Sequence, residues 1–168
     1  GFSAKFLDDI DLGRKEIFGD DRLIFPIRDE YGRPVGFSSR NLNYTADKQN
    51  GAKYVNQRGT GVKCNIYKKS TRLYGLYRVL ETHKRKPKPI YIVEGYSDVI
   101  TAVQHGISSC CAIGGTALTL DQILLLKKHG YYDIILCLDG DEVGQKRVAE
   151  LLDTVLSGHK DLKIRLVM

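Results

Sequence analysis

Short apolar runs alternate with amphipathic segments in the second half of the chain. The runs have the length and the β-branched content of buried strands, and they occupy residues 90–94, 110–113, 133–138 and 162–167. The segments between them repeat apolar residues at helical spacing, and they occupy residues 97–105, 119–129 and 142–156. Strands that alternate with helices predict an α/β domain with a mostly parallel, right-handed sheet flanked by helices.

The first half of the chain is less regular and predicts a smaller α+β subdomain. Residues 22–29 and 35–40 are strand-like and flank a turn-forming sequence at 31–34, which is typical of a hairpin. Residues 43–63 are polar and contain several glycines, so we expect a loop-rich surface there. A helix is predicted over residues 71–83.

A charged connector, Lys84–Pro89, contains no apolar side chain outside its two prolines and separates the two halves. We therefore predict a basic N-terminal subdomain over residues 1–88 and an α/β domain over residues 89–168. This division is also one of charge: residues 1–89 contain 19 Lys and Arg against 10 Asp and Glu, whereas residues 90–168 contain 7 against 10. A basic block with interleaved tyrosines beside an acidic region is typical of a protein that handles nucleic acid.

The composition is that of a globular protein, with 42% apolar and 27% charged residues among 168. No apolar run approaches the roughly 20 residues of a membrane span, and the first residues have no secretory pattern. None of the four cysteines forms the Cys-x-x-Cys spacing of a structural zinc site. We therefore expect a cytoplasmic protein with reduced core thiols, no zinc and no membrane partner.

Acidic residues follow two of the predicted strands directly. Glu94 comes after the strand at 90–93, and Asp139 and Asp141 come after the strand at 133–138. Because parallel strands present their carboxyl ends at one edge of a sheet, we expect these carboxylates to converge. Hard oxygen ligands of this kind suit Mg²⁺ or Mn²⁺ and indicate phosphoryl-transfer chemistry. Asp98 lies in the first turn of a predicted helix, where it is either a further metal ligand or an acid favoured by the helix dipole.

Several landmarks resemble a known family and follow the family's order along the chain. Glu94-Gly95, Gly115-Thr116 and Asp139-Gly140-Asp141, each after a strand, resemble the TOPRIM domain of primases, topoisomerases and related nucleases. In the first half the resemblance extends to Phe25–Asp29, Gly36–Arg40, Lys53–Asn56 and Lys69–Gly75. Together, over about residues 20–168, they resemble the catalytic core of bacterial and phage DnaG-type DNA primases.

This resemblance implies a DNA-directed RNA polymerase that makes short RNA primers on single-stranded DNA during replication. Two divalent ions would activate the attacking 3′-hydroxyl and neutralise the triphosphate. The implied metal ligands are Glu94, Asp98, Asp139 and Asp141, with Glu94, Asp139 and Asp141 as catalytic residues. The implied nucleotide- and DNA-binding residues are Arg28, Arg40, Lys53, Tyr54, Asn56, Lys69, Gly115 and Thr116. The implied partners are the template, ribonucleoside triphosphates and the replicative helicase of the primosome, through a region absent from these 168 residues.

The chemistry of these side chains agrees with those roles. Glu94 is suited to act as a general base or to orient a metal-bound hydroxyl. A lysine such as Lys53 or Lys69 beside a triphosphate offsets the negative charge that develops there. Arg28 and Arg40 can hold template phosphates through bidentate hydrogen bonds.

Three departures from the family pattern stand out. Ser38-Ser39 replaces a usual glycine pair, and Gln57 follows Asn56 where proline is frequent. The family also carries a further acidic cluster beyond the strand at which this chain ends, at Met168. We therefore expect a fragment that binds metal weakly and primes poorly by itself.

Other functions fit parts of the pattern. A TOPRIM nuclease or a topoisomerase fragment would use the same carboxylates, although a topoisomerase also needs a nucleophilic tyrosine. A haloacid-dehalogenase-like phosphatase also uses Asp-x-Asp after a strand, but leaves Glu94 unexplained. A non-catalytic module that binds single-stranded DNA is the alternative outside the enzymes.

Overall fold

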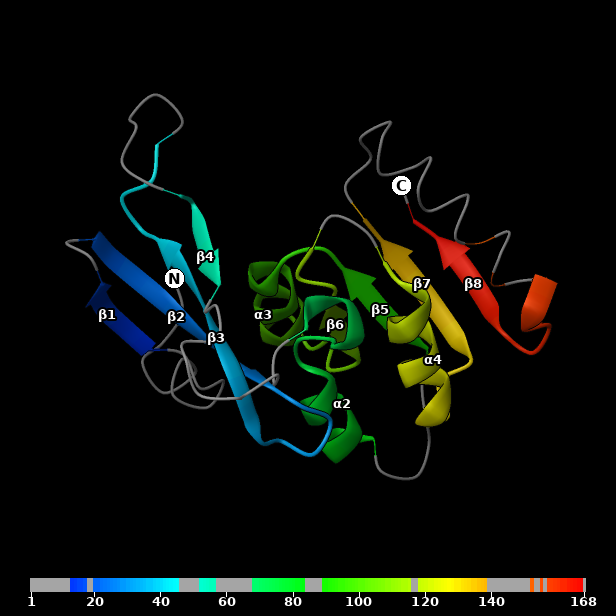
Figure 1. Cartoon of the computed structure of the whole chain (residues 1–168). Helices are drawn as coiled ribbons and strands as arrows, with labels where there is room; N and C mark the ends of the chain where they lie inside the picture. Colours follow the sequence, from blue (N-terminus) through cyan, green and yellow to red (C-terminus); the bar gives the residue numbers. More distant parts are fainter. Residues whose placement is uncertain are drawn as a thin grey trace. The chain divides into compact units, whose positions relative to one another are not determined.

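The computed structural model describes residues 13–17, 20–45, 52–56, 68–83, 89–115, 118–138 and 157–167, together with residues 152 and 155. The chain divides into two compact units (Figure 1). Unit 1 comprises Gly1–Arg28 and Arg33–Tyr67, and unit 2 comprises Asp29–Gly32 and Lys68–Met168. Residues 68–83 thus group with the C-terminal part of the chain, whereas the functional division between residues 88 and 89 stays a prediction.

Unit 1 contains a four-stranded antiparallel sheet. Its strands, in spatial as in sequence order, are β1 (Gly13–Ile17), β2 (Asp20–Arg28), β3 (Pro34–Asn41) and β4 (Tyr54–Asn56). The predicted hairpin is confirmed as β2 and β3, and its turn includes Gly32 at a φ of 81°. Phe25 and Ile27 of β2 are each 1% exposed and supply buried apolar surface for this sheet.

Strand β4 corrects one prediction for unit 1. The sequence predicts a loop-rich surface over residues 43–63, yet Tyr54–Asn56 pair with β3, where Arg40 is opposite Tyr54 and Ser38 is opposite Asn56. A three-residue strand is too short to show an alternating pattern, and its pairing partner lies distant in sequence. Strand β1 is likewise a strand that the sequence pattern does not predict.

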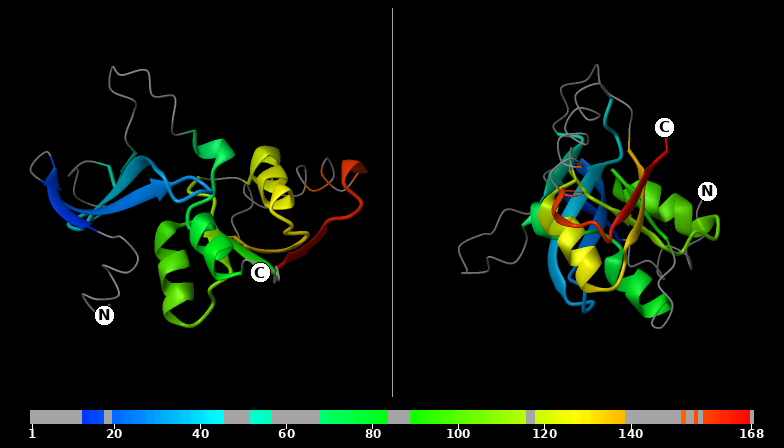
Figure 2. Two further views of the ribbon diagram at one scale, coloured as in Figure 1. Left: turned by 90° about the horizontal axis from the view of Figure 1, so that it is seen from below. Right: turned by 90° about the vertical axis from the view of Figure 1, so that its right-hand side faces the viewer.

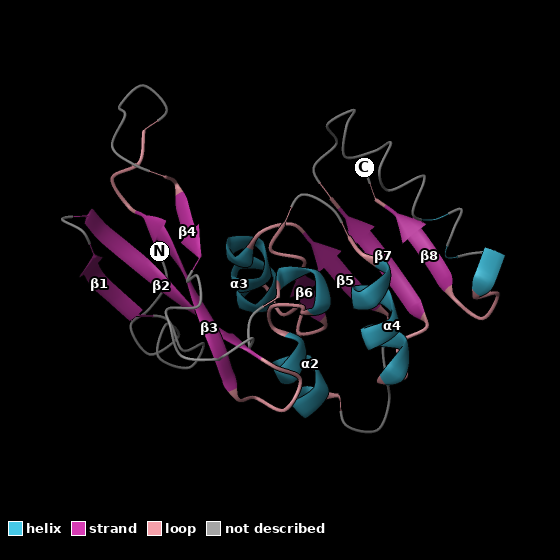
Figure 3. Cartoon of the chain, in the orientation of Figure 1, coloured by secondary structure: helices cyan, strands magenta, loops and turns pink. Residues whose placement is uncertain are grey.

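Unit 2 is built on a four-stranded parallel sheet in the order β6-β5-β7-β8 (Figure 3). The strands are β5 (Ile90–Val93), β6 (Cys110–Ala112), β7 (Asp133–Cys137) and β8 (Lys163–Leu166). All four predicted strands of the second half are therefore confirmed, as is the parallel α/β class. In the register of this sheet, Ile92 of β5 lies beside Cys111 of β6 and Leu136 of β7.

Two helices of unit 2 match their predicted ranges. They are α3 (Tyr96–Gln104) and α4 (Leu120–Lys128), and they lie on opposite faces of the parallel sheet (Figure 2). Helix α4 begins with the expected capping box, because Thr119 Oγ1 accepts the Gln122 N–H at 3.3 Å and Gln122 Oε1 accepts the Thr119 N–H at 3.1 Å. The helix expected over 142–156 falls largely outside the described residues.

The core of unit 2 lies between the sheet and these helices. Ile90, Ile92 and Ile134 of the sheet and Ile123 and Leu126 of α4 are fully buried. Burying a side chain of this size contributes about 1.5–3 kcal/mol, so these residues make a large contribution to the stability of the unit. No helix among the described residues is long and apolar enough to cross a membrane.

The described cysteines of unit 2 are free thiols. Cys110 and Cys111 are buried, as the apolar pattern predicts, and Cys137 is half-buried. Burial raises the pKa of Cys110 to about 12 and raises the pKa values of Cys111 and Cys137 as well. These thiols therefore stay protonated and unreactive at neutral pH. Cys64 lies outside the described residues.

The segment before β5 differs from its prediction. The helix expected over 71–83 begins only at Leu76 and ends at Thr82 as α2, preceded by a short 3₁₀ helix, η1 (Lys69–Thr71). Between them Tyr74 forms an isolated bridge with Ala112 of β6, through backbone hydrogen bonds of 2.9 and 3.0 Å. Gly75 then turns the chain with a φ of 85°. A bridge to a distant strand leaves no local signal in the sequence.

Candidate metal and nucleotide site

Backbone hydrogen bonds continue between the residues that follow β5 and β6, beyond the last paired residues of the two strands. The Ile113 N–H donates to the Val93 carbonyl at 3.0 Å, and the Gly114 N–H donates to the Glu94 carbonyl at 3.0 Å. Glu94 therefore lies at the end of the strand between β6 and β7, directly beside the turn that follows β6. This is the edge of a parallel sheet at which ligands normally bind.

Of the predicted carboxylates, Glu94 and Asp98 are in the described part of the chain, whereas Asp139 and Asp141 lie outside it. Their strand, β7, runs parallel to β5 with Cys137 beside Val93, and Leu138, the residue before Asp139, is the last one described there. The described residues contain no group of three or more His, Cys, Asp or Glu that could hold a metal ion.

Asp98 has a structural role at the start of α3. Its Oδ2 accepts a hydrogen bond from the Gly95 N–H at 2.9 Å, which caps the helix at an exposed position. An acid here is favoured by the unpaired N–H groups and by the helix dipole. The arrangement accounts for Asp98 without a metal, and its use as a ligand stays a prediction.

The glycine pair Gly114-Gly115 forms a tight turn beside Glu94. Gly114 has a φ of 61°, and a Cβ on it would lie 2.7 Å from the hydroxyl of Tyr96. Tyr96 is 4% exposed, so it cannot move away easily. A Cβ on Gly115, in contrast, would meet nothing closer than the Ile113 carbonyl at 3.9 Å. The turn thus has no room for a side chain at Gly114, whereas Gly115 is uncrowded, and a carboxylate such as that of Glu94 is a suitable ligand for Mg²⁺ or Mn²⁺. Thr116 lies outside the described residues.

Lys69 is half-buried in η1, and burial lowers the pKa of its amine. The backbone of η1 is held by α4. Gln122 Nε2 donates to the carbonyls of Lys69 at 3.1 Å and Arg72 at 2.8 Å, and Thr119 Oγ1 donates to the Ser70 carbonyl at 2.5 Å. The capping-box spacing predicts the pairing of Gln122 with Thr119, but nothing in the sequence indicates the hydrogen bonds with η1.

The predicted binding residues of unit 1 gather near the end of β3. The Arg40 guanidinium lies over the ring of Tyr54, 5.7 Å from its centroid, and this ring is 6.4 Å from that of Phe25. Arg40 and Lys53 line a depression of about 300 Å³. Its other lining residues are Leu23, Asn41, Leu42 and Tyr44. Two cations and adjacent aromatic rings make this a surface suited to phosphate and base contacts.

The remaining two predicted residues of unit 1 lie elsewhere on its sheet. Arg28 ends β2 just after a shift in the β2–β3 register and does not line the depression. Asn56 ends β4, two residues beyond Tyr54, and is half-buried. Arg40, Lys53 and Tyr54 are therefore brought together, and Arg28 and Asn56 are separate from them.

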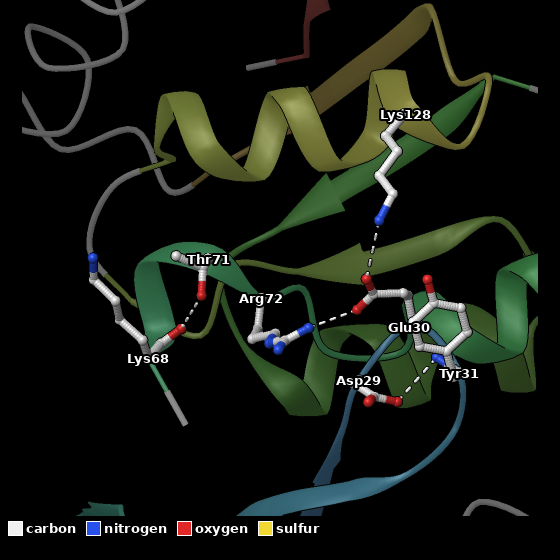
Figure 4. Close-up of polar contacts among 7 residues, drawn as sticks. All are labelled: Asp29, Glu30, Tyr31, Lys68, Thr71, Arg72 and Lys128. Carbon is white, nitrogen blue, oxygen red and sulfur yellow. Dashed lines mark hydrogen bonds and ion pairs between the residues drawn. The ribbon is translucent and has the colours of Figure 1, made fainter. Parts of the chain in front are cut away.

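A partly buried ion cluster that the sequence does not reveal lies in unit 2 (Figure 4). The Glu30 side chain is 8% exposed and pairs with Arg72 at 2.6 Å and with Lys128 at 3.5 Å. Burial acts to raise the pKa of Glu30, but a backbone hydrogen bond and the two cations outweigh it and hold this pKa below its ordinary value. Asp29 Oδ1 shapes the same turn by accepting the Tyr31 N–H at 3.0 Å. The cluster fastens residues 29–32 to the body of unit 2.

Two sequence-family models cover most of the chain. Residues 9–80 match the family described as "DNA primase catalytic core, N-terminal domain", and residues 91–167 match the family described as "Toprim-like". A parallel sheet with an acidic residue at the end of a strand agrees with the second match. The two matches follow one another along the chain without overlap.

Individual relatives agree with this assignment. A DNA primase of Legionella pneumophila is 42% identical over 80% of this chain and 22% of its own length. A DNA primase of Buchnera aphidicola subsp. Baizongia pistaciae is 39% identical over 96% of this chain and 27% of its own length. A solved DnaG primase catalytic domain bound to single-stranded DNA superposes with a TM-score of 0.73 and 34% identity, covering 88% of this chain and 43% of that one.

The chain belongs to the DnaG-type DNA primases, of which it represents part of the catalytic core. It spans about a quarter of the length of the curated relatives, 22% and 27% for the two described above. The family resemblance inferred from the sequence motifs is thereby confirmed.

Proposed function

We propose that this chain is the catalytic segment of a primase that synthesises short RNA primers on single-stranded DNA by two-metal nucleotidyl transfer. The observation that carries the proposal is the edge of the parallel sheet at Glu94. There the Gly114 N–H donates to the Glu94 carbonyl at 3.0 Å, and Gln122 links η1, which bears Lys69, to the adjoining Ile113 carbonyl at 3.3 Å. In the proposal, the Glu94 carboxylate and the Lys69 ammonium group would both act on a metal-bound triphosphate at this edge, where they would hold the metal and offset the negative charge.

The metal ligands in this proposal are Glu94, Asp139 and Asp141. Bound Mg²⁺ or Mn²⁺ would lower the pKa of the attacking hydroxyl and neutralise the triphosphate. Glu94 would orient the ion and accept the proton that the 3′-hydroxyl loses. Lys69 would bind the triphosphate, because a half-buried ammonium interacts more strongly with an anion than an exposed one does.

The template would bind to unit 1. In the proposal, Arg40 and Lys53 hold phosphates at the depression near the end of β3, and Tyr54 offers its ring for stacking. Arg28 and Asn56 would bind the strand elsewhere along the sheet. Single-stranded DNA, ribonucleoside triphosphates and a replicative helicase, through a region outside these residues, are the proposed partners, in the cytoplasm.

The decisive experiment is template-dependent incorporation of labelled ribonucleotides by the full protein that contains these residues. We expect short RNA products in Mg²⁺, and we expect Glu94→Gln and Asp139→Asn to abolish them without loss of thermal stability. The matched control is Glu81→Gln, at an exposed position on α2. Near-normal synthesis by Glu94→Gln would contradict the metal assignment. DNA cleavage without RNA synthesis would favour the nuclease alternative.

A further inference from the structure

The side chain of Gln122 is a buried polar group of unit 2. It is 1% exposed, on the first turn of α4. The two N–H groups of its Nε2 are shared among three carbonyls, those of Arg72 at 2.8 Å, Lys69 at 3.1 Å and Ile113 at 3.3 Å. A buried amide must be paired in this way, since an unmade hydrogen bond in the interior costs about 1–3 kcal/mol.

The three carbonyls belong to two separate segments. Those of Lys69 and Arg72 bracket η1, because the Arg72 N–H donates to the Lys69 carbonyl at 3.2 Å. The third, of Ile113, precedes Gly114, whose N–H donates to the Glu94 carbonyl. A single side chain thus fixes η1 to the sheet edge at which Glu94 lies.

The short helix η1 depends on polar interactions for its position. It has three residues, none of them buried, so burial of its own apolar surface does not set where it lies. A second side chain of the α4 cap, Thr119, donates a hydrogen bond to the Ser70 carbonyl. The polar groups at the start of α4, with Gln122 at their centre, therefore hold the backbone of η1 itself, and the Tyr74–Ala112 bridge anchors the chain that follows it.

We propose that Gln122 is a positioning residue for Lys69, and that it sets the distance of this ammonium group from the metal-bound triphosphate at Glu94. The expected effect of Gln122 on catalysis rests on the proposed function. Its effect on the position of Lys69 does not. A misplacement of about 1 Å can lower a reaction rate by about a hundredfold, so the hydrogen bonds of one amide suffice for a large effect.

The substitution Gln122→Glu separates this role from the helix cap. A glutamate retains the oxygen that accepts the Thr119 N–H, but it has no N–H to offer to the three carbonyls. Gln122→Met removes the donors without adding charge and serves where the charged variant is unstable. Gln104→Glu makes the same chemical change at an exposed position at the end of α3 and is the matched control.

The structural part is tested on the 168-residue chain, independently of any activity. Acetylation by acetic anhydride over a range of pH, followed by mass spectrometry, gives the titration midpoint of the Lys69 amine. Because burial lowers the pKa of Lys69, release of η1 should raise this midpoint. We expect a rise in Gln122→Glu and in Gln122→Met but not in Gln104→Glu. An unchanged midpoint in both variants at residue 122 would overturn the inference.

The catalytic part is tested by combining substitutions in the full protein. We expect Gln122→Glu to lower kcat/KM for ribonucleotides by about ten- to a hundredfold and to leave affinity for single-stranded DNA unchanged. If Gln122 acts through Lys69, the double variant with Lys69→Gln should be no worse than Lys69→Gln alone. Additive losses would show that Gln122 serves only the fold. Absence of RNA synthesis by the unmodified protein would instead contradict the proposed function, while the acetylation result would still decide the structural part.

Discussion

Neutralising Glu30 should destabilise unit 2 by removing the anion of its ion cluster. The carboxylate is nearly buried, and its pairing with Arg72 at 2.6 Å is a charge-assisted hydrogen bond, worth about 1.5–3 kcal/mol. The pairing with Lys128 at 3.5 Å involves a 59% exposed lysine, and such pairs contribute about 0–1 kcal/mol. Because glutamine keeps a weaker hydrogen bond, we expect Glu30→Gln to lower the free energy of unfolding by about 1–2 kcal/mol at neutral pH.

This destabilisation should depend on pH in a defined direction. The pKa of Glu30 is lowered in the folded protein, so its charge stabilises the fold above the ordinary pKa of 4.5. The stabilisation disappears as the pH falls through the lowered, folded-state pKa. The difference between the parent chain and Glu30→Gln should therefore be full above about pH 5 and shrink below about pH 4.

Urea unfolding over this pH range measures the difference, with Glu81→Gln as the exposed control on α2. Arg72→Gln should cost about as much as Glu30→Gln, whereas Lys128→Gln should cost less than about 0.5 kcal/mol. A double-mutant cycle between Glu30 and Arg72 isolates the pair and should give a coupling of about 1 kcal/mol. Equal stability of Glu30→Gln and the parent chain at neutral pH, or a difference that persists unchanged in acid, would refute the reasoning.

Three further predictions concern the site and its surroundings. Gly114→Ala should destabilise unit 2 by about 1–3 kcal/mol, since the new methyl group would lie 2.7 Å from the Tyr96 hydroxyl in a left-handed backbone conformation. A Tm equal to that of the parent chain would contradict this. Replacing Arg40 and Lys53 together by glutamine should weaken single-stranded DNA binding. The slope of log K against log salt concentration should become shallower by about 0.7 for each phosphate that is no longer neutralised. An unchanged slope in filter-binding titrations would count against the depression as a binding surface. Asp98→Ala should lower stability by about 1 kcal/mol through removal of the helix cap. Mn²⁺ titration of the same variant tests the predicted ligand role, which a large fall in affinity would support and an unchanged affinity would contradict.

The parallel sheet could be predicted because its signals are local. Each strand is a short apolar run, and the helices between the strands are bounded by features such as the Thr119 capping box and Gly130. The position of Glu94 follows from that pattern alone, since the end of a parallel strand is a defined place.

Apart from β1, which pairs with the adjacent strand β2, the features that the sequence does not indicate depend on pairing between distant residues. Helix α2 begins late because Tyr74 pairs with Ala112, and β4 exists because β3 offers an edge. Glu30 and Arg72 are 42 positions apart, and their charges are ordinary members of a charged sequence. The buried amide of Gln122 is recognisable only as a cap, because the acceptors of its Nε2 lie in segments that local patterns do not connect.

The ion cluster also bears on how this core can be recombined with those of its relatives. The turn Asp29–Gly32 lies inside the β2–β3 hairpin in sequence yet groups with unit 2, so the chain passes between the two units three times, after Arg28, Gly32 and Tyr67. A chimera that exchanges the N-terminal sheet as one block would import a foreign turn onto Arg72 and Lys128. Where that turn lacks an acid, both cations would be deprived of their partner. The turn should therefore be exchanged together with Arg72 and Lys128, because the three form one set of paired charges.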